Sequence, residues 1–313
     1  MIDGAGEAGV DPARTRDLLD AVTAADGVEP FGEAFLRGLD DPDAGHRHVH
    51  ALEGDRLVGV AAVADDAVEL AVDADRRRRG AGRALLDAVD DLAGTRLPVW
   101  AHGNVDGASE LATATGRRVV RELLQMTAGP DVIRELSDDE EAPDGIRVES
   151  LVRARARLGD EAVDDAWLAV NNEAFDWHPE QGGWDADRLR RAREVEWFDP
   201  EGVLFAVEEN TGEILGFHWT KRHGGGDASN GGDEGDGSGE GPGEVGEVYV
   251  IGLASAARGR GIGGWLTREG MRHLRDGGSD RVILYVEGDN SPAVNTYRRT
   301  GFDVTRRDVM YGM

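Results

Sequence analysis

The chain has 313 residues, no cysteine, and a formal net charge of −27 from 62 acidic and 35 basic residues. Without cysteine, disulfides, thiolate nucleophiles and cysteine metal sites are excluded, and so acidic a chain argues against nucleic acid and anionic membranes as partners. Acidic residues occur in every segment and Lys221 is the single lysine. This composition is typical of a protein that works in high salt, where the repulsion between like charges is screened.

The length predicts two domains, each large enough to form its own core. No apolar run approaches the roughly 18 residues of a membrane span. The first residues lack both the basic and the apolar regions of a signal peptide. We therefore expect a cytoplasmic protein, and we expect it to be a monomer.

The first half opens with the alternating residues His46, His48 and His50, which share one face if their segment is a strand. No carboxylate is placed with them, so we interpret the segment as a surface strand and expect no metal site. The elements predicted next are strands at 56–64 and 67–73, an arginine- and glycine-rich loop at 77–82, a helix at 83–92, a strand at 97–104, a short helix at 108–116 and a closing strand at 117–126.

Residues 128–145 contain two prolines and a cluster of charges, which is typical of an interdomain linker. The second half then repeats the order of the first. Its predicted elements are strands at 213–221 and 247–254, a loop at 258–263, a helix at 264–274, a strand at 281–290, a short helix at 293–301 and a closing strand at 302–313. Between its first two strands, the acidic, glycine-rich residues 224–246 predict a disordered loop.

The two halves are copies of one α+β unit. Gly80 and Gly261 occupy equivalent places 181 residues apart, and Asn104 and Asn290 occupy equivalent places 186 residues apart. In each unit the strands follow one another like hairpins before the helix, and a strand follows it. This order predicts a mixed, mostly antiparallel sheet.

The pattern R-x-x-G-x-G occurs in both loops, and it has two interpretations. Gly261 and Gly263 allow the backbone to approach a ligand. The helix that follows offers free N–H groups to an anion such as a diphosphate, beside Arg258 and Arg260. The alternative is a plain glycine turn. The order of elements is neither that of a Rossmann domain nor that of a P-loop.

The order strand, R-x-x-G-x-G, helix, strand, N-x-x-A-x-x-x-Y-x-x-x-G-F resembles that of the GNAT acetyltransferase superfamily. The whole chain is similar to the mycothiol synthase family of tandem GNAT enzymes. The matches include "VNNEAFDWHPEQGGW", "LGFHWTK" and "ILYVEGDNSPAVNTYRRTGF". The resemblance implies an α+β fold of two tandem GNAT domains, at residues 1–135 and 143–313, each a mixed, mostly antiparallel sheet flanked by helices. The loop at 224–246 is longer than the family's.

The resemblance also implies an activity. It is the direct transfer of acetyl from acetyl-CoA to the amine of a small molecule, namely a cysteine linked to an amino sugar. Glu247 would be the general base and Tyr297 the acid that protonates the CoA thiolate. A solvated carboxylate and a core tyrosine are the alternative interpretations. The residues implied to bind acetyl-CoA in the second half are Ile251, Gly252, Leu253, Arg258, Gly259, Arg260, Gly261, Ile262, Gly263, Gly264, Asn290, Ser291, Pro292, Ala293, Val294 and Asn295. Asn290 is equally suited to be a helix N-cap.

For the acceptor, the resemblance implies Glu33, Glu180, Lys221, Glu247 and Tyr285. Trp184 and Trp219 suit either stacking walls or core packing. Other acceptors remain open: another small amine, another thiol precursor, or a protein N-terminus. A third possibility is an acyl-CoA-binding sensor without turnover.

The first half is expected to be a structural or a cofactor-binding half without catalysis. Its implied cofactor residues are Leu70, Ala71, Val72, Arg78, Arg79, Gly80, Ala81, Gly82 and Arg83. The position that matches Tyr297 falls near Leu111 or Ala112, so no proton donor is expected there. The position that matches Glu247 falls near Asp66.

Overall fold

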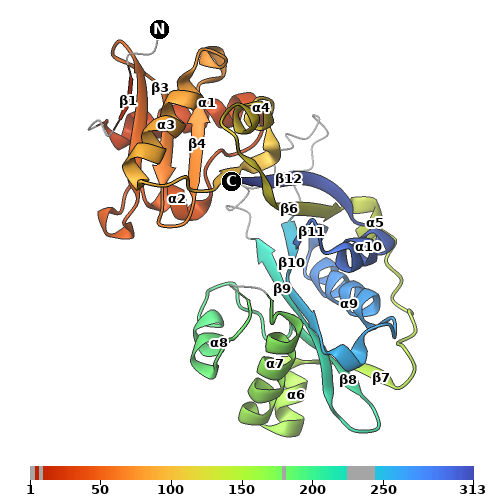
Figure 1. Ribbon diagram of the computed structural model, residues 1–313. Helices are drawn as coiled ribbons and strands as arrows, with labels where there is room; N and C mark the ends of the chain where they lie inside the picture. Colours follow the sequence, from red (N-terminus) through yellow and green to blue (C-terminus); the bar gives the residue numbers. More distant parts are fainter. Residues whose placement is uncertain (1–3, 7–9, 178–180, 224–243) are drawn as a thin grey trace.

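The computed structural model describes residues 4–6, 10–177, 181–223 and 244–313. These residues form one twelve-stranded sheet with helices on both faces, as Figure 1 shows. The strand order is β1-β2-β3-β4-β5-β12-β6-β11-β10-β9-β8-β7. Within the described ranges, the parallel pairs are β4 with β5 and β10 with β11, and the other neighbours are antiparallel. The predicted α+β fold with a mixed, mostly antiparallel sheet is therefore confirmed.

The elements follow the predicted order. In the first half they are β1 (Gly4–Gly6), α1 (Pro12–Asp26), α2 (Glu33–Arg37), β2 (Arg47–Glu53), β3 (Arg56–Val63), β4 (Val68–Val72), α3 (Ala81–Ala93), β5 (Val99–Ala101), α4 (Ala108–Ala114), β6 (Arg118–Ala128) and α5 (Pro130–Arg134). In the second half they are β7 (Ile146–Ser150), α6 (Leu151–Leu158), α7 (Asp160–Ala174), α8 (Ala186–Ala192), β8 (Val203–Glu208), β9 (Ile214–His223), β10 (Glu244–Leu253), α9 (Ile262–Asp276), β11 (Ser279–Glu287), α10 (Ser291–Arg299) and β12 (Asp303–Gly312).

Two local expectations need correction. Strand β10 begins at Glu244, so residues 244–246 of the predicted loop belong to a strand, while residues 224–243 lie outside the described chain. Gly246 allows helix α9 to pack closely on this part of the strand, because a Cβ there would lie 2.9 Å from Leu274. The histidine segment is not a pure surface strand either. His50 is buried on β2, with its Nε2 3.4 Å from the Thr15 hydroxyl.

The closing strands of the two halves have exchanged places. Strand β12 lies between β5 and β6, with Val309 opposite both Ala101 and Glu122. Strand β6 in turn pairs with β11 of the second half, with Gln125 opposite Tyr285. In Figure 1 the dark blue β12 runs beside β6 toward the first half of the chain. Each half is thus closed by the last strand of the other half, an arrangement that the sequence repeat does not predict.

The two parallel pairs separate before their strands end. Strands β4 and β5 pair at Val68 and Glu69. Strands β10 and β11 pair as far as Val248 opposite Leu284, and a register shift with β9 follows at Tyr249. Beyond these points, backbone N–H and C=O groups that would otherwise bind the neighbouring strand are available to other partners. Each half therefore offers a backbone edge inside its sheet.

Cores on both faces of the sheet fix these edges in place. On one face, Leu85, Leu86 and Val89 of α3 are fully buried against the first half. On the other face, Trp167 of α7 packs edge-on against Phe205 and Trp219 of the second half. Burying each such side chain contributes about 1.5–3 kcal/mol relative to leaving it exposed. The loops that enter α3 and α9 are thereby held on rigid supports.

Helix α9 approaches β9 closely at Gly270. The His218 side chain of β9 is fully buried there, and its Nδ1 lies 3.0 Å from the Leu266 carbonyl oxygen. Burial lowers the pKa of His218 to about 4, so the ring is neutral at neutral pH. A Cβ at Gly270 would overlap the atoms of this ring. Glycine is therefore required at this crossing.

Candidate active site

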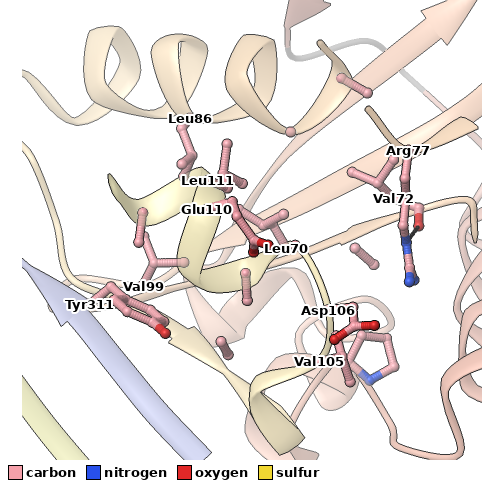
Figure 2. Close-up of a pocket in the computed structure, with 18 of the residues that line it drawn as sticks. Leu70, Val72, Arg77, Leu86, Val99, Val105, Asp106, Glu110, Leu111 and Tyr311 are labelled. Atoms are coloured by element: carbon pink, nitrogen blue, oxygen red, sulfur yellow. Dashed lines mark hydrogen bonds between the residues drawn. The ribbon is translucent and has the colours of Figure 1, made fainter. Parts of the chain in front are cut away.

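The first half contains a cavity of about 360 Å³ where β4 and β5 separate, bounded by α3 and α4 (Figure 2). Its walls are mainly apolar, with Leu70, Val72, Val99 and Leu111 among them. Every residue implied to bind acetyl-CoA in this half lines the cavity except Arg79. The described part of the first half thus brings these predicted residues together around one space.

One wall of this cavity comes from the other half of the chain. Tyr311 of β12 lines it, and its hydroxyl donates a hydrogen bond of 2.7 Å to Asn104 Oδ1. His102, at the end of β5, lines it as well. The exchange of strands therefore brings to this cavity a phenol that the sequence of the first half does not supply, since the repeat has Leu111 and Ala112 at the positions that match Tyr297.

The arginine- and glycine-rich loops of the two halves follow the same backbone path. Gly259 and Gly261 have φ of 74° and 79°, and the equivalent residues Arg78 and Gly80 have φ of 61° and 94°. A left-handed arginine costs about 1–2 kcal/mol, so the loop shape is kept in the first half despite this cost. Both loops lead directly into a helix, α3 or α9, whose first N–H groups are free to bind an anion.

Acidic side chains already hold some of the loop arginines. Arg77 makes two hydrogen bonds to the Asp26 carboxylate, of 2.8 and 2.6 Å. Arg260 makes two to Glu208, of 2.8 and 3.3 Å. Arg258 is exposed at the second loop. A diphosphate would therefore compete with carboxylates for some of these cations, while the helix N–H groups remain available.

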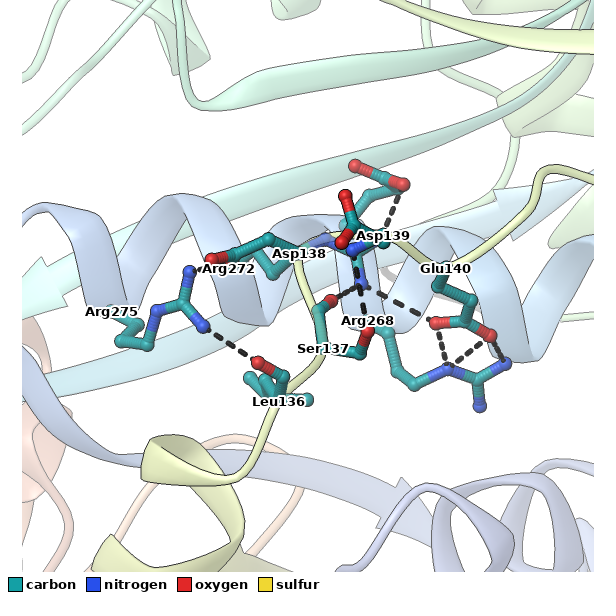
Figure 3. Close-up of polar contacts among 9 residues, drawn as sticks. Leu136, Ser137, Asp138, Asp139, Glu140, Arg268, Arg272 and Arg275 are labelled. Carbon is teal, nitrogen blue, oxygen red and sulfur yellow. Dashed lines mark hydrogen bonds and ion pairs between the residues drawn. The ribbon is translucent and has the colours of Figure 1, made fainter.

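The predicted linker fixes α9 from outside, as Figure 3 shows. Glu140 accepts hydrogen bonds of 2.8 and 2.6 Å from Arg268 Nε, and Arg272 donates to the Ser137 carbonyl at 3.0 Å. Arg275 donates to the Leu136 carbonyl at 2.9 Å and pairs with Asp138. The acidic segment between the halves is thus bound along the helix that carries the second loop.

The remaining second-half residues implied to bind CoA gather near the start of α9. Ile251, Gly252 and Leu253 lie on β10 beyond its last pair with β11. The segment 290–295 begins α10, whose Thr296 would lie 3.8 Å from a Cβ at Gly264. Asn290 is an N-cap, since its side chain accepts a hydrogen bond of 3.3 Å from the Ala293 N–H. A strand edge, a helix start and a short helix therefore converge here.

One face of the sheet carries polar side chains across the junction of the halves. Lys221 on β9 is directly opposite Glu247 on β10, and Tyr285 on β11 lies on the same face. Gln125 on β6 is opposite Tyr285 and donates a hydrogen bond of 3.1 Å to its hydroxyl. Directly opposed residues of neighbouring strands share a face. The structure thus brings together three of the five residues implied to bind the acceptor.

The other two acceptor residues are less defined. Glu33 is exposed at the start of α2, where the preceding Gly32 N–H donates a hydrogen bond of 2.7 Å to Glu69. Glu180 lies outside the described residues. Trp219 is 1% exposed and packs against Trp167, Trp197 and Tyr249, so it serves the core.

Glu247 is buried and paired. Its Oε2 lies 2.7 Å from Nε2 of His223, and the two side chains are 11% and 19% exposed. Lys221, although opposite Glu247, directs its ammonium over the Trp197 ring at 5.2 Å. The sequence missed His223. Its alternation with Lys221 on one strand, which places both on the face of Glu247, is the signal that could have found it.

Tyr297 is buried on α10 and packs against Phe302. Burial raises the pKa of this phenol well above its usual value, so the side chain keeps its proton at neutral pH. Retention of the proton is the property required of a group that protonates a leaving thiolate. Core packing and the acid role are therefore compatible.

A second buried polar cluster ties the exchanged strand to the first half. His102 Nε2 lies 2.8 Å from Glu69 Oε1, and its Nδ1 lies 3.5 Å from Asp308 of β12. Asp308 also accepts hydrogen bonds from the Gly103 N–H and from Arg306. Burial alone would lower the pKa of His102, but the bonds to the two carboxylates outweigh it and raise the pKa to about 9.

This cluster also corrects a sequence expectation. Asp66, the position matched to Glu247, lies exposed in a bend, while Glu69 is buried at the end of the pairing between β4 and β5. The register between β9 and β10 shifts by one residue at Tyr249, and the register between β3 and β4 has no such shift. One residue does not span the three positions from Asp66 to Glu69, so the sequence repeat does not predict this buried carboxylate.

We expect the His102 cluster to make stability depend on pH in the alkaline range. The folded pKa of about 9 exceeds the ordinary value of about 6.5 in an unfolded chain. The stabilisation, on the order of 3 kcal/mol, is complete below about pH 6.5 and is lost as the pH rises through about 9. Urea unfolding of wild type and His102→Gln from pH 6 to 10 measures it. A difference in the free energy of unfolding that stays constant over this range would contradict the expectation.

Comparison with known proteins decides the family. The model of the Acetyltransferase (GNAT) family matches residues 15–108 and 167–302, which is more than half of the chain. The chain belongs to the GNAT family. It is 43% identical over 306 residues to a mycothiol acetyltransferase of Corynebacterium aurimucosum, with 95% of this chain and 93% of the relative covered. It is 41% identical to that of Mycolicibacterium vanbaalenii, with 96% and 93% covered.

Solved GNAT structures share the fold. A GCN5-related N-acetyltransferase from Sphaerobacter thermophilus matches with a TM-score of 0.68 at 24% identity, covering 98% of this chain and 94% of that one. A tandem GNAT protein from the clavulanic acid biosynthesis pathway matches with a TM-score of 0.60 at 19% identity, covering 96% and 93%. The predicted tandem GNAT architecture and the resemblance to mycothiol synthases are both confirmed.

The chain is therefore an acetyltransferase, and enzymes of the GNAT family take their acetyl group from acetyl-CoA. Among the described residues, no group of histidine, aspartate and glutamate side chains is arranged to hold a metal ion. None of the described helices combines the length and the apolar character needed to cross a bilayer. Glu247 and Tyr297, the two residues implied to transfer protons, lie in the second half, and the cavity of about 360 Å³ described above lies in the first half.

Proposed function

We propose that the second half transfers acetyl from acetyl-CoA to the primary amine of a cysteine linked to an amino sugar. The observation that carries this proposal is the position of Glu247, a buried carboxylate next to the point where β10 and β11 separate. The identity to mycothiol acetyltransferases over nearly the whole chain supports the acceptor. The row of polar side chains beside Glu247 suits the hydroxyl groups of a sugar.

The loop before α9 and the edge of β10 suit two parts of acetyl-CoA, its diphosphate and its amide-containing arm. Gly259 and Gly261 allow a backbone path that directs N–H groups toward a diphosphate, with Arg258 beside them. The unpaired edge of β10 at 251–253 offers N–H and C=O groups to an amide-containing arm. We propose that these residues hold the donor in the second half.

In this mechanism Glu247 accepts a proton from the ammonium group of the acceptor, which frees its lone pair. As the amine attacks the thioester carbonyl, a C–N bond forms and the C–S bond breaks. Backbone N–H groups at the edge of β10 stabilise the negative charge that develops on the carbonyl oxygen. Tyr297 donates its proton to the departing sulfur, and the second proton lost by the nitrogen as it becomes an amide restores the phenol. No covalent intermediate with the enzyme is needed.

The decisive experiment offers the protein acetyl-CoA with a panel of amines and follows the N-acetyl product by mass spectrometry. The panel contains a cysteinyl amino-sugar conjugate, glucosamine and a peptide with a free N-terminus. We expect acetylation of the conjugate alone. Acetylation of glucosamine or the peptide in its place would contradict the acceptor. Binding of CoA without any product would contradict the transfer itself.

We further propose that the first-half cavity binds a second acetyl-CoA, as its lining supports. We expect calorimetry to find two CoA molecules per chain. Replacing Val105, which lines the cavity, by Trp fills much of the space and should reduce the number to one. Val152→Trp, at an exposed site on α6, should leave two. One CoA per wild-type chain would contradict the proposal.

A further inference from the structure

The proposed base, Glu247, is paired with an imidazole that the mechanism above does not use. His223 is opposite Val245 in the ladder between β9 and β10, so it is the diagonal neighbour of Glu247 on the same face. Their 2.7 Å contact joins Nε2 to Oε2. Because Lys221 lies over Trp197, His223 is the basic group that contacts this carboxylate among the described residues.

The proposed reaction must dispose of a proton at each turnover. The nitrogen of an ammonium loses two protons when it becomes an amide, and the leaving sulfur takes up one. One proton therefore has to leave the site for solvent. Glu247 is buried, and its Oε1 makes no hydrogen bond with a described residue. The His223 side chain is the more exposed member of the pair, at 19% against 11%.

We propose that His223 orients Glu247 and carries its proton to solvent. The carboxylate takes the proton as the N–H bond of the ammonium breaks. The imidazole, with its own proton on Nδ1, takes the carboxyl proton at Nε2 and releases the Nδ1 proton to water. Exchange with water then returns the remaining proton from Nε2 to Nδ1, which restores both groups. This inference rests on the proposed function of Glu247. His223 acts through Glu247, so it is a positioning residue and not one that contacts the acceptor.

The other charged or titratable groups around the pair do not fit this task. Lys221 on β9 holds its charge over an aromatic ring. Burial raises the pKa of Tyr249 on β10 and of Tyr285 on β11 above the ordinary value of a phenol. Arg281 on β11 is opposite Val245 on this face, and a guanidinium does not lose its proton in proteins. An imidazole is the side chain that ordinarily exchanges a proton near neutral pH.

The test compares His223→Ala and His223→Gln with wild type in steady-state acetylation from pH 5 to 9. Both variants should lower kcat at least about tenfold and leave the KM for acetyl-CoA unchanged. Imidazole added to the buffer should restore several-fold activity in His223→Ala, because a free base can occupy the space. His223→Gln keeps a hydrogen-bond donor but cannot carry a proton, and it should stay slow and without rescue.

His273→Gln is the matched control, because His273 is also paired with a carboxylate, Asp199, at 2.9 Å, away from Glu247. It should keep the rate and pH profile of wild type. A wild-type rate in His223→Gln at every pH would overturn the inference. Glu247→Gln distinguishes a failure of the proposed role of Glu247 from a failure of the proposed role of His223. If that variant retains full activity, the proposed role of Glu247 as the base fails, and if it is inactive while both His223 variants are normal, only this inference fails.

Discussion

Replacing Glu247 by Gln is expected to lower kcat about 10²- to 10⁴-fold, the usual contribution of a positioned general base. Glutamine keeps the shape of the side chain and can still bond to His223, but it cannot accept the proton of an ammonium group. The carboxylate is buried and paired at 2.7 Å, so its replacement alters one defined interaction. Acetyl transfer to the cysteinyl conjugate under saturating acetyl-CoA measures the effect.

Glu244→Gln provides the control for this prediction. Glu244 is the first residue of the same strand and is opposite Ser279 on β11, three residues before Glu247. The same chemical change there should alter kcat less than twofold. If kcat falls by a similar factor in both variants, the cause is the lost negative charge on the strand and not the loss of a general base.

Gly270→Ala is expected to destabilise the protein by about 3 kcal/mol. A new Cβ would overlap the fully buried His218 ring and break its bond to the Leu266 carbonyl. Overpacking costs about 1–3 kcal/mol, and a buried polar group without its partner costs about 1–3 kcal/mol more. The higher helix propensity of alanine offsets only about 1 kcal/mol of this loss in the free energy of unfolding. Urea denaturation at pH 7 measures the change.

Gly264→Ala on the same helix is the matched control. Its Cβ would make only ordinary contacts, the nearest at 3.7 Å to Arg268. The same substitution should therefore leave stability unchanged or raise it by up to about 1 kcal/mol. Equal destabilisation of both variants would mean that the contact with His218 is not the cause.

The sequence predicted the local order of elements because that information lies in short segments. Alternation defined the strands, and glycine with arginine defined the two loops whose φ values agree between Arg78 and Gly259. It could not predict which closing strand pairs with which half. Strands β6 and β12 come from the same place in a duplicated unit, and the partner of each is decided by packing far along the chain.

The same limit applies to the candidate site. Lys221, Glu247 and Tyr285 were found through family motifs, and the structure places them on one face. His223 and Glu69 were missed for different reasons. His223 stands at the border of a segment without periodicity, and Glu69 lies three residues from Asp66, the position that the constant offset between the halves matches to Glu247.

The exchange of closing strands has a consequence for synthesis on the ribosome. Residues 303–312 are made after the other eleven strands of the described sheet, yet they supply a partner of β5 and carry Tyr311 into the first-half cavity. Until they emerge, β5 presents an unpaired edge, which is a template for association with other chains. The first half therefore cannot complete its folding before the second, and the usual order of N-terminal domain first does not hold for this enzyme.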